Sequence, residues 1–272
     1  MKIGTYIYAL GSVAAGVLDF IWADFDPAHQ PIQAWGDHIP GREALAYIAA
    51  IWLVAAGVAI LWRRTAAGGA VALGLAHLMF SVFWLPRLYT APHVLGFRAP
   101  VVIGVLVGVF EQLILVAAAV ILYVRSSEGR FSPANATLVA RWTFGIGALV
   151  FGVNHLLNIG PTAEMVPKWM PFGTNFWVVF TGIAFVLAGL AILAGVLEVL
   201  AAGLLGLMLL VFSALALAPL IFAYPHAHPV WGGNAYNLTA IGAAWIFAGA
   251  LASRRANSGS DRVRAAATEL RS

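Results

Sequence analysis

The side chains of this sequence that are best able to do chemistry lie inside long apolar stretches. They are Asp19, His77, Glu111, Asn154 and His155. An ionisable group inside a membrane-spanning helix is costly, and it usually faces the interior of a bundle or a wet cavity. There it can hold a proton or orient the polar end of a ligand. We therefore predict that these five residues contribute to a binding site; the alternative is that local helix groups or interfacial water satisfy each of them.

Three further histidines lie at or beside a sequence ending that the chain contains twice. Residues 85–93 read LPRLYTAPH, and residues 218–226 read APLIFAYPH. Each has two prolines six residues apart and then a histidine, His93 or His226, and His228 follows the second. Proline fixes φ and lacks an N–H, so a repeated helix end would explain the motif. The alternative is that these histidines face a shared cavity.

The histidines do not form a recognised metal motif. His226-x-His228 offers two ligands, but the sequence contains no His-Glu-x-x-His motif and no cysteine. The lack of cysteine also excludes thiol–disulfide chemistry, Fe–S clusters and covalently attached haem. Only His77 lies well inside an apolar stretch, so we predict neither a metal site nor a haem.

Composition indicates the environment of these groups. The chain is 62% hydrophobic and 10% charged, with a mean hydropathy of +0.90, whereas soluble domains are about 25% charged. We therefore predict an integral membrane protein whose main partner is the lipid bilayer. The net charge of +4 does not indicate a nucleic-acid partner, because the Lys and Arg residues lie in the predicted loops and tail.

Eight apolar stretches are long enough to cross a bilayer as helices. The segment 174–222 is too long for a single crossing, and Gly195 and Glu198 mark the best place for a tight turn within it. We predict an all-α polytopic membrane protein with spans at 4–24, 44–62, 67–86, 100–124, 140–158, 174–194, 199–222 and 235–252.

The distribution of basic residues predicts the orientation. With both termini in the cytoplasm, eleven of the 15 Lys and Arg residues fall on the cytoplasmic side. Cytoplasmic loops carry an excess of Lys and Arg. We therefore expect cytoplasmic N- and C-termini, and a location in a bacterial inner membrane.

Ordered landmarks predict a tandem repeat. GVLDFIW at 16–22 pairs with GVNHLLN at 152–158, and AGVAIL at 56–61 pairs with AGLAIL at 188–193, followed by the two proline–histidine endings. We predict two antiparallel four-helix bundles in tandem. The expected divisions are a first unit at 1–124, a cytoplasmic linker at 125–141, a second unit at 142–253 and a mobile cytoplasmic polar tail at 254–272.

The repeat also suggests which polar groups meet. Asp19 and His155 occupy equivalent positions, so a carboxylate–imidazole pair near the axis between the units is expected. Glu111 lies in the middle of a span and needs a partner or a proton. His77 is the nearest candidate partner by depth.

The second half of the chain resembles the DoxX-like family of four-helix membrane proteins. The resemblance rests on the helix end GVNHLLN, on the M-V-P-x-W-x-P sequence of residues 165–171, and on a W-x-x-x-x-G helix that carries AGLAIL. It covers Arg141 to about Ala252, and the first half matches only through its pairing with the second. The resemblance implies a compact antiparallel bundle, sometimes associated with quinone-linked oxidoreductase complexes such as thiosulfate:quinone oxidoreductase.

Two functions follow as hypotheses. The first is a membrane subunit of a redox complex that binds a quinone in a pocket open to the outer side. Polar residues gather at the predicted outer helix ends, and Trp169 would line the mouth of the pocket. The second is a non-catalytic scaffold or a permease-like module that binds a small solute.

Overall fold

The chain folds into a bundle of membrane-spanning length. The structure, a computed structural model, describes residues 2–30, 39–127 and 132–269, with side chains as far as residue 257. In these ranges it contains helices and turns but no strand, and eight helical segments are long and apolar enough to cross a membrane. The predicted all-α protein with eight spans is confirmed.

The first four spans are formed by five helices. They are α1 (Lys2–Trp22), α2 (Arg42–Ala59), α3 (Ala66–Trp84) with the short α4 (Arg87–Leu95), and α5 (Ala99–Ser126).

The other four spans include a π-helical turn and a long last helix. They are α6 (Pro133–Leu157), α8 (Thr174–Ala194), α9 (Glu198–Phe212) continued by the π-turn η1 (Ser213–Leu217) and α10 (Ala218–Ala223), and α11 (His228–Glu269), and the short α7 (Ile159–Ala163) lies in the loop after α6.

The predicted turn inside the longest apolar segment is confirmed. α8 ends at Ala194 and α9 begins at Glu198. Gly195 has φ +69°, a left-handed conformation that glycine adopts without a Cβ penalty. Leu197 also has a positive φ, of +51°, so the reversal depends on two left-handed residues separated by one.

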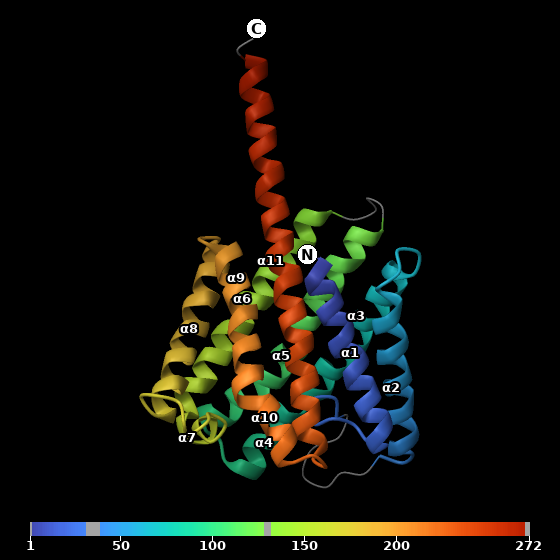
Figure 1. The fold of residues 1–272 in the computed structure, drawn as a ribbon, viewed down its shortest axis with the longest axis vertical. Helices are drawn as coiled ribbons and strands as arrows, with labels where there is room; N and C mark the ends of the chain where they lie inside the picture. Colours follow the sequence, from blue (N-terminus) through green and yellow to red (C-terminus); the bar gives the residue numbers. More distant parts are fainter. Residues whose placement is uncertain (1, 31–38, 128–131, 270–272) are drawn as a thin grey trace.

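The eight spans form a closed circuit that is drawn in at its middle, where α5 and α11 pack against each other. Neighbours in the chain pack against each other around the circuit, and α1 packs along α11 to close it. α5 and α11 are also the most buried spans: 61% and 67% of the residues in their apolar 18-residue stretches are buried, against 22–44% for the other spans. Figure 1 shows α11 and α5 behind one another in the middle of the bundle, and α1 begins at the end where α11 leaves it.

Helix contacts in the two halves correspond. The pairs α1–α2, α2–α3 and α3–α5 have counterparts in α6–α8, α8–α9 and α9–α11. A Cβ at Gly16 would meet the carbonyl oxygen of Ala50 at 2.6 Å, and one at Gly152 would meet that of Gly182 at 2.7 Å. These contacts place the same small residue at the same crossing in each half. They agree with the tandem repeat, whose unit boundaries remain a prediction; residues 128–131 of the linker lie outside the described residues.

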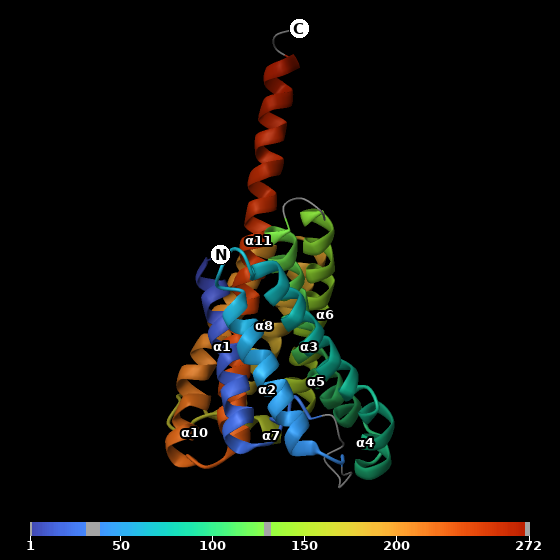
Figure 2. The ribbon, with the colours of Figure 1, turned by 90° about the vertical axis from the view of Figure 1, so that its right-hand side faces the viewer.

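The repeated proline does not end a helix in the second half. The motif favoured a helix end at this position, but Pro219 lies in the first turn of α10 and the helix continues to Ala223, close to the predicted span end at 222. The π-turn that precedes it alters the helix just before a residue that cannot donate an N–H. The predicted polar tail is helical where the structure describes it, because α11 continues beyond the bundle as far as Glu269 (Figures 1 and 2).

Candidate functional site

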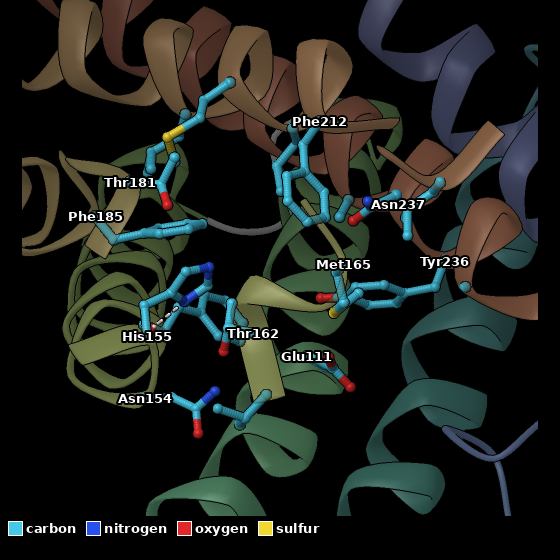
Figure 3. A pocket seen from close by; sticks show the side chains of 18 of the residues that line it. Glu111, Asn154, His155, Thr162, Met165, Thr181, Phe185, Phe212, Tyr236 and Asn237 are labelled. Atoms are coloured by element: carbon cyan, nitrogen blue, oxygen red, sulfur yellow. Dashed lines mark hydrogen bonds between the residues drawn. The ribbon is translucent and has the colours of Figure 1, made fainter. Parts of the chain in front are cut away.

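The second half of the bundle contains a cavity of about 470 Å³. It lies between α5, α6, α8, α9 and α11, and the segment after α6 closes part of it. Phe, Leu, Ile, Val, Met and Ala side chains form most of its wall. A smaller group of polar side chains points inward (Figure 3): Glu111, Asn154, His155, Thr162, Thr181, Tyr236 and Asn237. Three of them, Glu111, Asn154 and His155, were predicted from the sequence as site residues.

His155 presents a defined hydrogen-bonding atom to this cavity. Its Nδ1 lies 2.8 Å from the carbonyl oxygen of Phe151, one turn earlier in α6. A carbonyl oxygen can only accept, so Nδ1 carries the hydrogen. In the neutral ring Nε2 is therefore an acceptor, and it points into the cavity (Figure 3). The ring also packs against Phe185 of α8, at 5.3 Å between centroids, which limits its rotation.

Glu111 and Tyr236 supply further polar groups from the two central helices. Among the described residues, the carboxylate of Glu111 makes no hydrogen bond, although it lines the cavity. Tyr236 of α11 lies across the cavity from His155, and Glu111 of α5 lies between them at one edge (Figure 3). The cavity thus offers acceptors and a phenol within an apolar wall, a composition typical of small-molecule sites.

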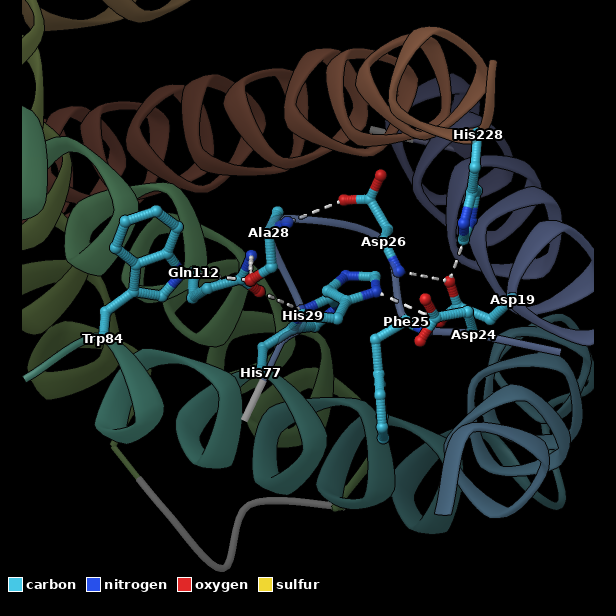
Figure 4. A network of polar contacts seen from close by, with 10 residues as sticks. All are labelled: Asp19, Asp24, Phe25, Asp26, Ala28, His29, His77, Trp84, Gln112 and His228. Atoms are coloured by element: carbon cyan, nitrogen blue, oxygen red, sulfur yellow. Dashed lines mark hydrogen bonds and ion pairs between the residues drawn. The ribbon is translucent and has the colours of Figure 1, made fainter. Parts of the chain in front are cut away.

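The first half contains a folded loop where the second half contains the cavity. Residues 23–30 enter the bundle between α1, α3, α5 and α11 (Figure 4). The carbonyl oxygen of Ala28 accepts hydrogen bonds from Nε1 of Trp84 at 3.0 Å and from Nε2 of Gln112 at 3.4 Å. Nη2 of Arg87 donates to the carbonyl oxygen of Gln30. Backbone groups that enter an apolar interior need such partners, which three helices provide here.

Asp19 is the centre of this loop's polar network. Its carboxylate is fully buried and accepts the backbone N–H of Asp26 at 2.9 Å. Nδ1 of His29 lies 3.3 Å from Oδ2, and Nε2 of His228 lies 3.4 Å from Oδ1. Trp22 stacks on the His228 ring at 4.9 Å. A buried carboxylate with three nitrogen partners ties α1 to the loop and to the start of α11.

Burial and neighbouring charges shift the pKa values of two loop residues, Asp26 and His29. Burial raises the pKa of Asp26 above its usual value, and the positive charge of His29 offsets only part of this. Burial lowers the pKa of His29, but the hydrogen bond to Asp19 and the charges of Asp19 and Asp26 outweigh it, so that pKa lies above its usual value. Each of these two groups therefore keeps its proton to a higher pH in the folded protein than in the unfolded chain.

His77 joins the loop network to α5. Its Nδ1 lies 2.9 Å from Oε1 of Gln112, so Nδ1 donates and Nε2 is an acceptor. Nε2 is buried and has no hydrogen-bond partner among the described residues. The expected pairing of His77 with Glu111 is wrong, because the helix turns Glu111 toward the cavity and its neighbour Gln112 toward His77.

The remaining predicted residues divide between the network and the surface. Asp19, His77 and His228 belong to the loop network. His93 lies in α4, exposed, with its Nδ1 2.7 Å from the carbonyl oxygen of Tyr89. His226 and Trp169 are also exposed, and neither lines the cavity.

The expected pair of Asp19 and His155 does not form among the described residues. Asp19 binds the inserted loop, and His155 faces the cavity of the other half. Their equivalent positions therefore place them in separate halves of the bundle, each pointing into its own half.

Sequence reasoning missed several residues of both sites: Asp26, His29, Gln112, Tyr236 and Asn237. His29 and Asp26 lie in a predicted loop, and neither carries a signal unless that loop is known to fold inward. Gln112 had a weak signal as an amide beside a buried acid. Tyr236 and Asn237 lie in an ordinary apolar helix, where spacing does not distinguish them.

No group of three or more His, Asp or Glu side chains that could hold a metal ion occurs within the described part of the chain. In the loop network, His29 and His77 hydrogen-bond to Asp19 and Gln112, and His228 lies within ion-pair distance of Asp19. Comparisons of the chain with protein-family models, curated proteins and solved structures find no match. The function must therefore be argued from the cavity.

Proposed function

We propose that this protein binds the head group of a quinone or quinol in the cavity of its second half. The observation that carries the proposal is an apolar cavity of about 470 Å³ in which Glu111, His155 and Tyr236 converge. A quinol presents hydroxyl groups at opposite ends of an apolar ring. Acceptors at opposite sides of an apolar cavity match that arrangement.

The acceptor at His155 favours a hydroxyl-bearing ligand. Since Nδ1 donates to Phe151, neutral His155 offers a lone pair at Nε2 and would accept the hydroxyl hydrogen of a quinol. Tyr236 can donate or accept and would serve either redox form at the other side. Glu111 would accept from a ligand hydroxyl when ionised, or donate to a carbonyl when protonated.

The redox setting of the proposal comes from the sequence. The resemblance of residues 141–252 to DoxX-like proteins supports a membrane subunit of a quinone-linked oxidoreductase complex, with partner subunits that exchange electrons with the bound molecule. A bacterial inner membrane, with cytoplasmic termini and the cavity in the outer half of the bundle, is part of the same proposal.

The test is direct binding to purified protein in lipid nanodiscs. A short-chain benzoquinol should quench tryptophan fluorescence saturably. His155→Leu should weaken binding by roughly five- to thirtyfold, because it removes one hydrogen bond worth about 1–2 kcal/mol. His93→Leu, at an exposed histidine outside the cavity, should bind as the unmodified protein does.

Two outcomes would contradict the proposal. Absence of saturable binding by the unmodified protein would favour the scaffold role. Equal binding by the His155 and His93 variants would place the ligand elsewhere. Thermal unfolding of both variants must remain within a few degrees of the unmodified protein for the comparison to hold.

A further inference from the structure

A second cavity adjoins the first and is almost wholly apolar. It measures about 410 Å³ and lies between α8, α9, the π-turn η1 and the loop residues 166–170. The two cavities share five lining residues: His155, Thr162, Thr181, Met208 and Phe212. The polar cavity therefore continues sideways into this second space, which we call the α8–α9 groove.

The groove lies at the edge of the bundle that is most exposed to lipid. Only 28% and 22% of the residues are buried in the apolar 18-residue stretches of the spans formed by α8 and by α9 with its continuation, the lowest values of the eight spans. Leu204, Leu207 and Val211 of the groove are about half exposed (47–51%). In a membrane these side chains face hydrocarbon, so a molecule in the lipid can reach the groove without crossing water.

The length of the groove corresponds to one leaflet. Its lining on α9 and η1 runs from Leu204 to Ala216, thirteen residues whose twelve steps rise about 18 Å along a helix. Half of the hydrocarbon core of a bilayer is roughly 15 Å. Trp177 and Met170, near the start of α8, lie at the same end of the bundle as His155. The groove thus extends from the end of the bundle that carries His155 toward the middle of the membrane.

Polar groups are distributed unequally between the two spaces. Glu111, Asn154, Tyr236 and Asn237 line only the first cavity, whereas residues confined to the groove are almost all apolar. One ligand matches both spaces if a polar head is joined to a long hydrocarbon tail. A compact solute would leave the groove unfilled.

We propose that the ligand is a tailed, lipid-soluble molecule that reaches its site from the outer leaflet between α8 and α9. Its head lies in the polar cavity and its hydrocarbon tail lies in the α8–α9 groove. This inference rests on the proposed function and adds the ligand class and the route. The junction between the polar cavity and the groove is lined by His155, Met208 and Phe212. The head must pass this junction to enter the cavity, and the tail leaves the cavity through it.

The test uses two quinones with the same head, one without a tail and one with a long saturated tail. Binding is measured in nanodiscs, with concentrations expressed as mole fraction in the lipid, because lipid tails are as apolar as the groove. Leu207→Trp should fill the groove and weaken binding of the tailed quinone by at least about tenfold, since an overpacked site excludes the tail. Binding of the tailless quinone should change less than about twofold.

Leu200→Trp is the matched control. Leu200 lies seven residues earlier on α9, on nearly the same face, is 55% exposed, and does not line the groove. It should leave binding of both quinones unchanged. If Leu207→Trp weakens both quinones equally, or neither, the tail does not lie in the groove and the inference is overturned while the proposed function stands. If the unmodified protein binds neither quinone, both are overturned.

A second measurement does not depend on any substitution. A quinone with a photoreactive diazirine at the end of its tail should label the unmodified protein on α8 or α9, at residues of the groove such as Phe180 and Leu204. A tailless competitor should suppress this labelling, because the head anchors the tail. Labelling that persists with competitor, or that falls on other helices, would show that an unanchored hydrocarbon chain reaches the protein instead, and would overturn the inference.

Discussion

Glu111 and Gln112 are consecutive residues of α5 that face the two halves of the bundle. Glu111 lines the cavity of the second half, whereas Gln112 bonds to His77 and to the carbonyl oxygen of Ala28 in the first half. Successive residues on a helix point about 100° apart, so a central helix can serve both sides. One turn of α5 therefore belongs to both polar sites.

This division predicts opposite effects for neighbouring substitutions. Glu111→Gln should weaken quinol binding by severalfold and change thermal stability little, because the cavity leaves room around the side chain. Gln112→Leu should lower stability by about 1–3 kcal/mol, because it leaves Nδ1 of His77 without its buried acceptor and removes one of the two donors to the carbonyl oxygen of Ala28. Ligand titration and denaturation of each variant check the prediction, and an exchange of the two effects would refute it.

The packing of the inserted loop on α11 can be tested with adjacent glycines. A Cβ at Gly232 would lie 1.6 Å from Oδ2 of Asp26, while a Cβ at Gly233 would meet no atom within 4 Å. Gly232→Ala should therefore destabilise the protein by about 1–3 kcal/mol. Gly233→Ala should be neutral or slightly stabilising, since alanine favours the helix. Similar melting temperatures for both variants would show that the loop does not pack in this way.

The stability should fall as pH rises above about 6.5. His29 has a folded-state pKa above its usual value of 6.5, so its contribution is complete below pH 6.5 and is lost as pH rises through the folded pKa. One such proton gives a slope of at most about 1.4 kcal/mol per pH unit. The raised pKa of Asp26 has the same sign, but its contribution begins to fall at lower pH, above its usual value of 3.8.

Melting curves between pH 6 and 8.5 measure this slope. His29→Gln should flatten the decrease, and His93→Gln, at an exposed histidine, should not. A stability that increases over this range, or a His29 variant with an unchanged slope, would contradict the assignment of the proton to His29.

At the opposite end of the bundle, a buried acid joins three helices through ion pairs. Glu198, at the start of α9, is 5% exposed and pairs with Arg141 of α6 and, at 3.6 Å, with Arg255 of α11. Removing one partner of a buried ion pair commonly costs about 3–5 kcal/mol. We expect Glu198→Gln to approach the lower value, since both arginines are partly exposed. Glu43→Gln, at an exposed acid of α2, is the control for chemical denaturation and should change little.

The orientation can be measured because the chain contains no cysteine. By the positive-inside rule, Tyr224→Cys should react with a membrane-impermeant maleimide in intact cells. Asn257→Cys should react only after the cells are permeabilised. The reverse pattern would invert the protein and place the cavity in the cytoplasmic half.

The fold was largely predictable because length and hydrophobicity alone decide which segments can span a bilayer. The turn at Gly195 and Glu198 was predictable for the same reason: a 49-residue apolar segment must reverse somewhere, and glycine permits it. The sites were predictable only in part. Their positions within the predicted spans identified Asp19, Glu111 and His155 as residues that are costly to bury. The partners of these residues depend on helix rotation and on the inward path of residues 23–30. Neither has a local signature.

The π-turn η1 has a consequence for the history of the chain. AGVAIL and AGLAIL start 132 residues apart, at Ala56 and Ala188, and α3 and α9 also begin 132 apart. The prolines that follow, Pro86 and Pro219, are 133 apart. One additional residue therefore separates the helix start from the proline in the second half, and a π-turn takes up one more residue than an α-turn. If the two halves arose by duplication, an insertion of a single amino acid into the copied helix would thus be absorbed as a bulge, which keeps the flanking turns in register.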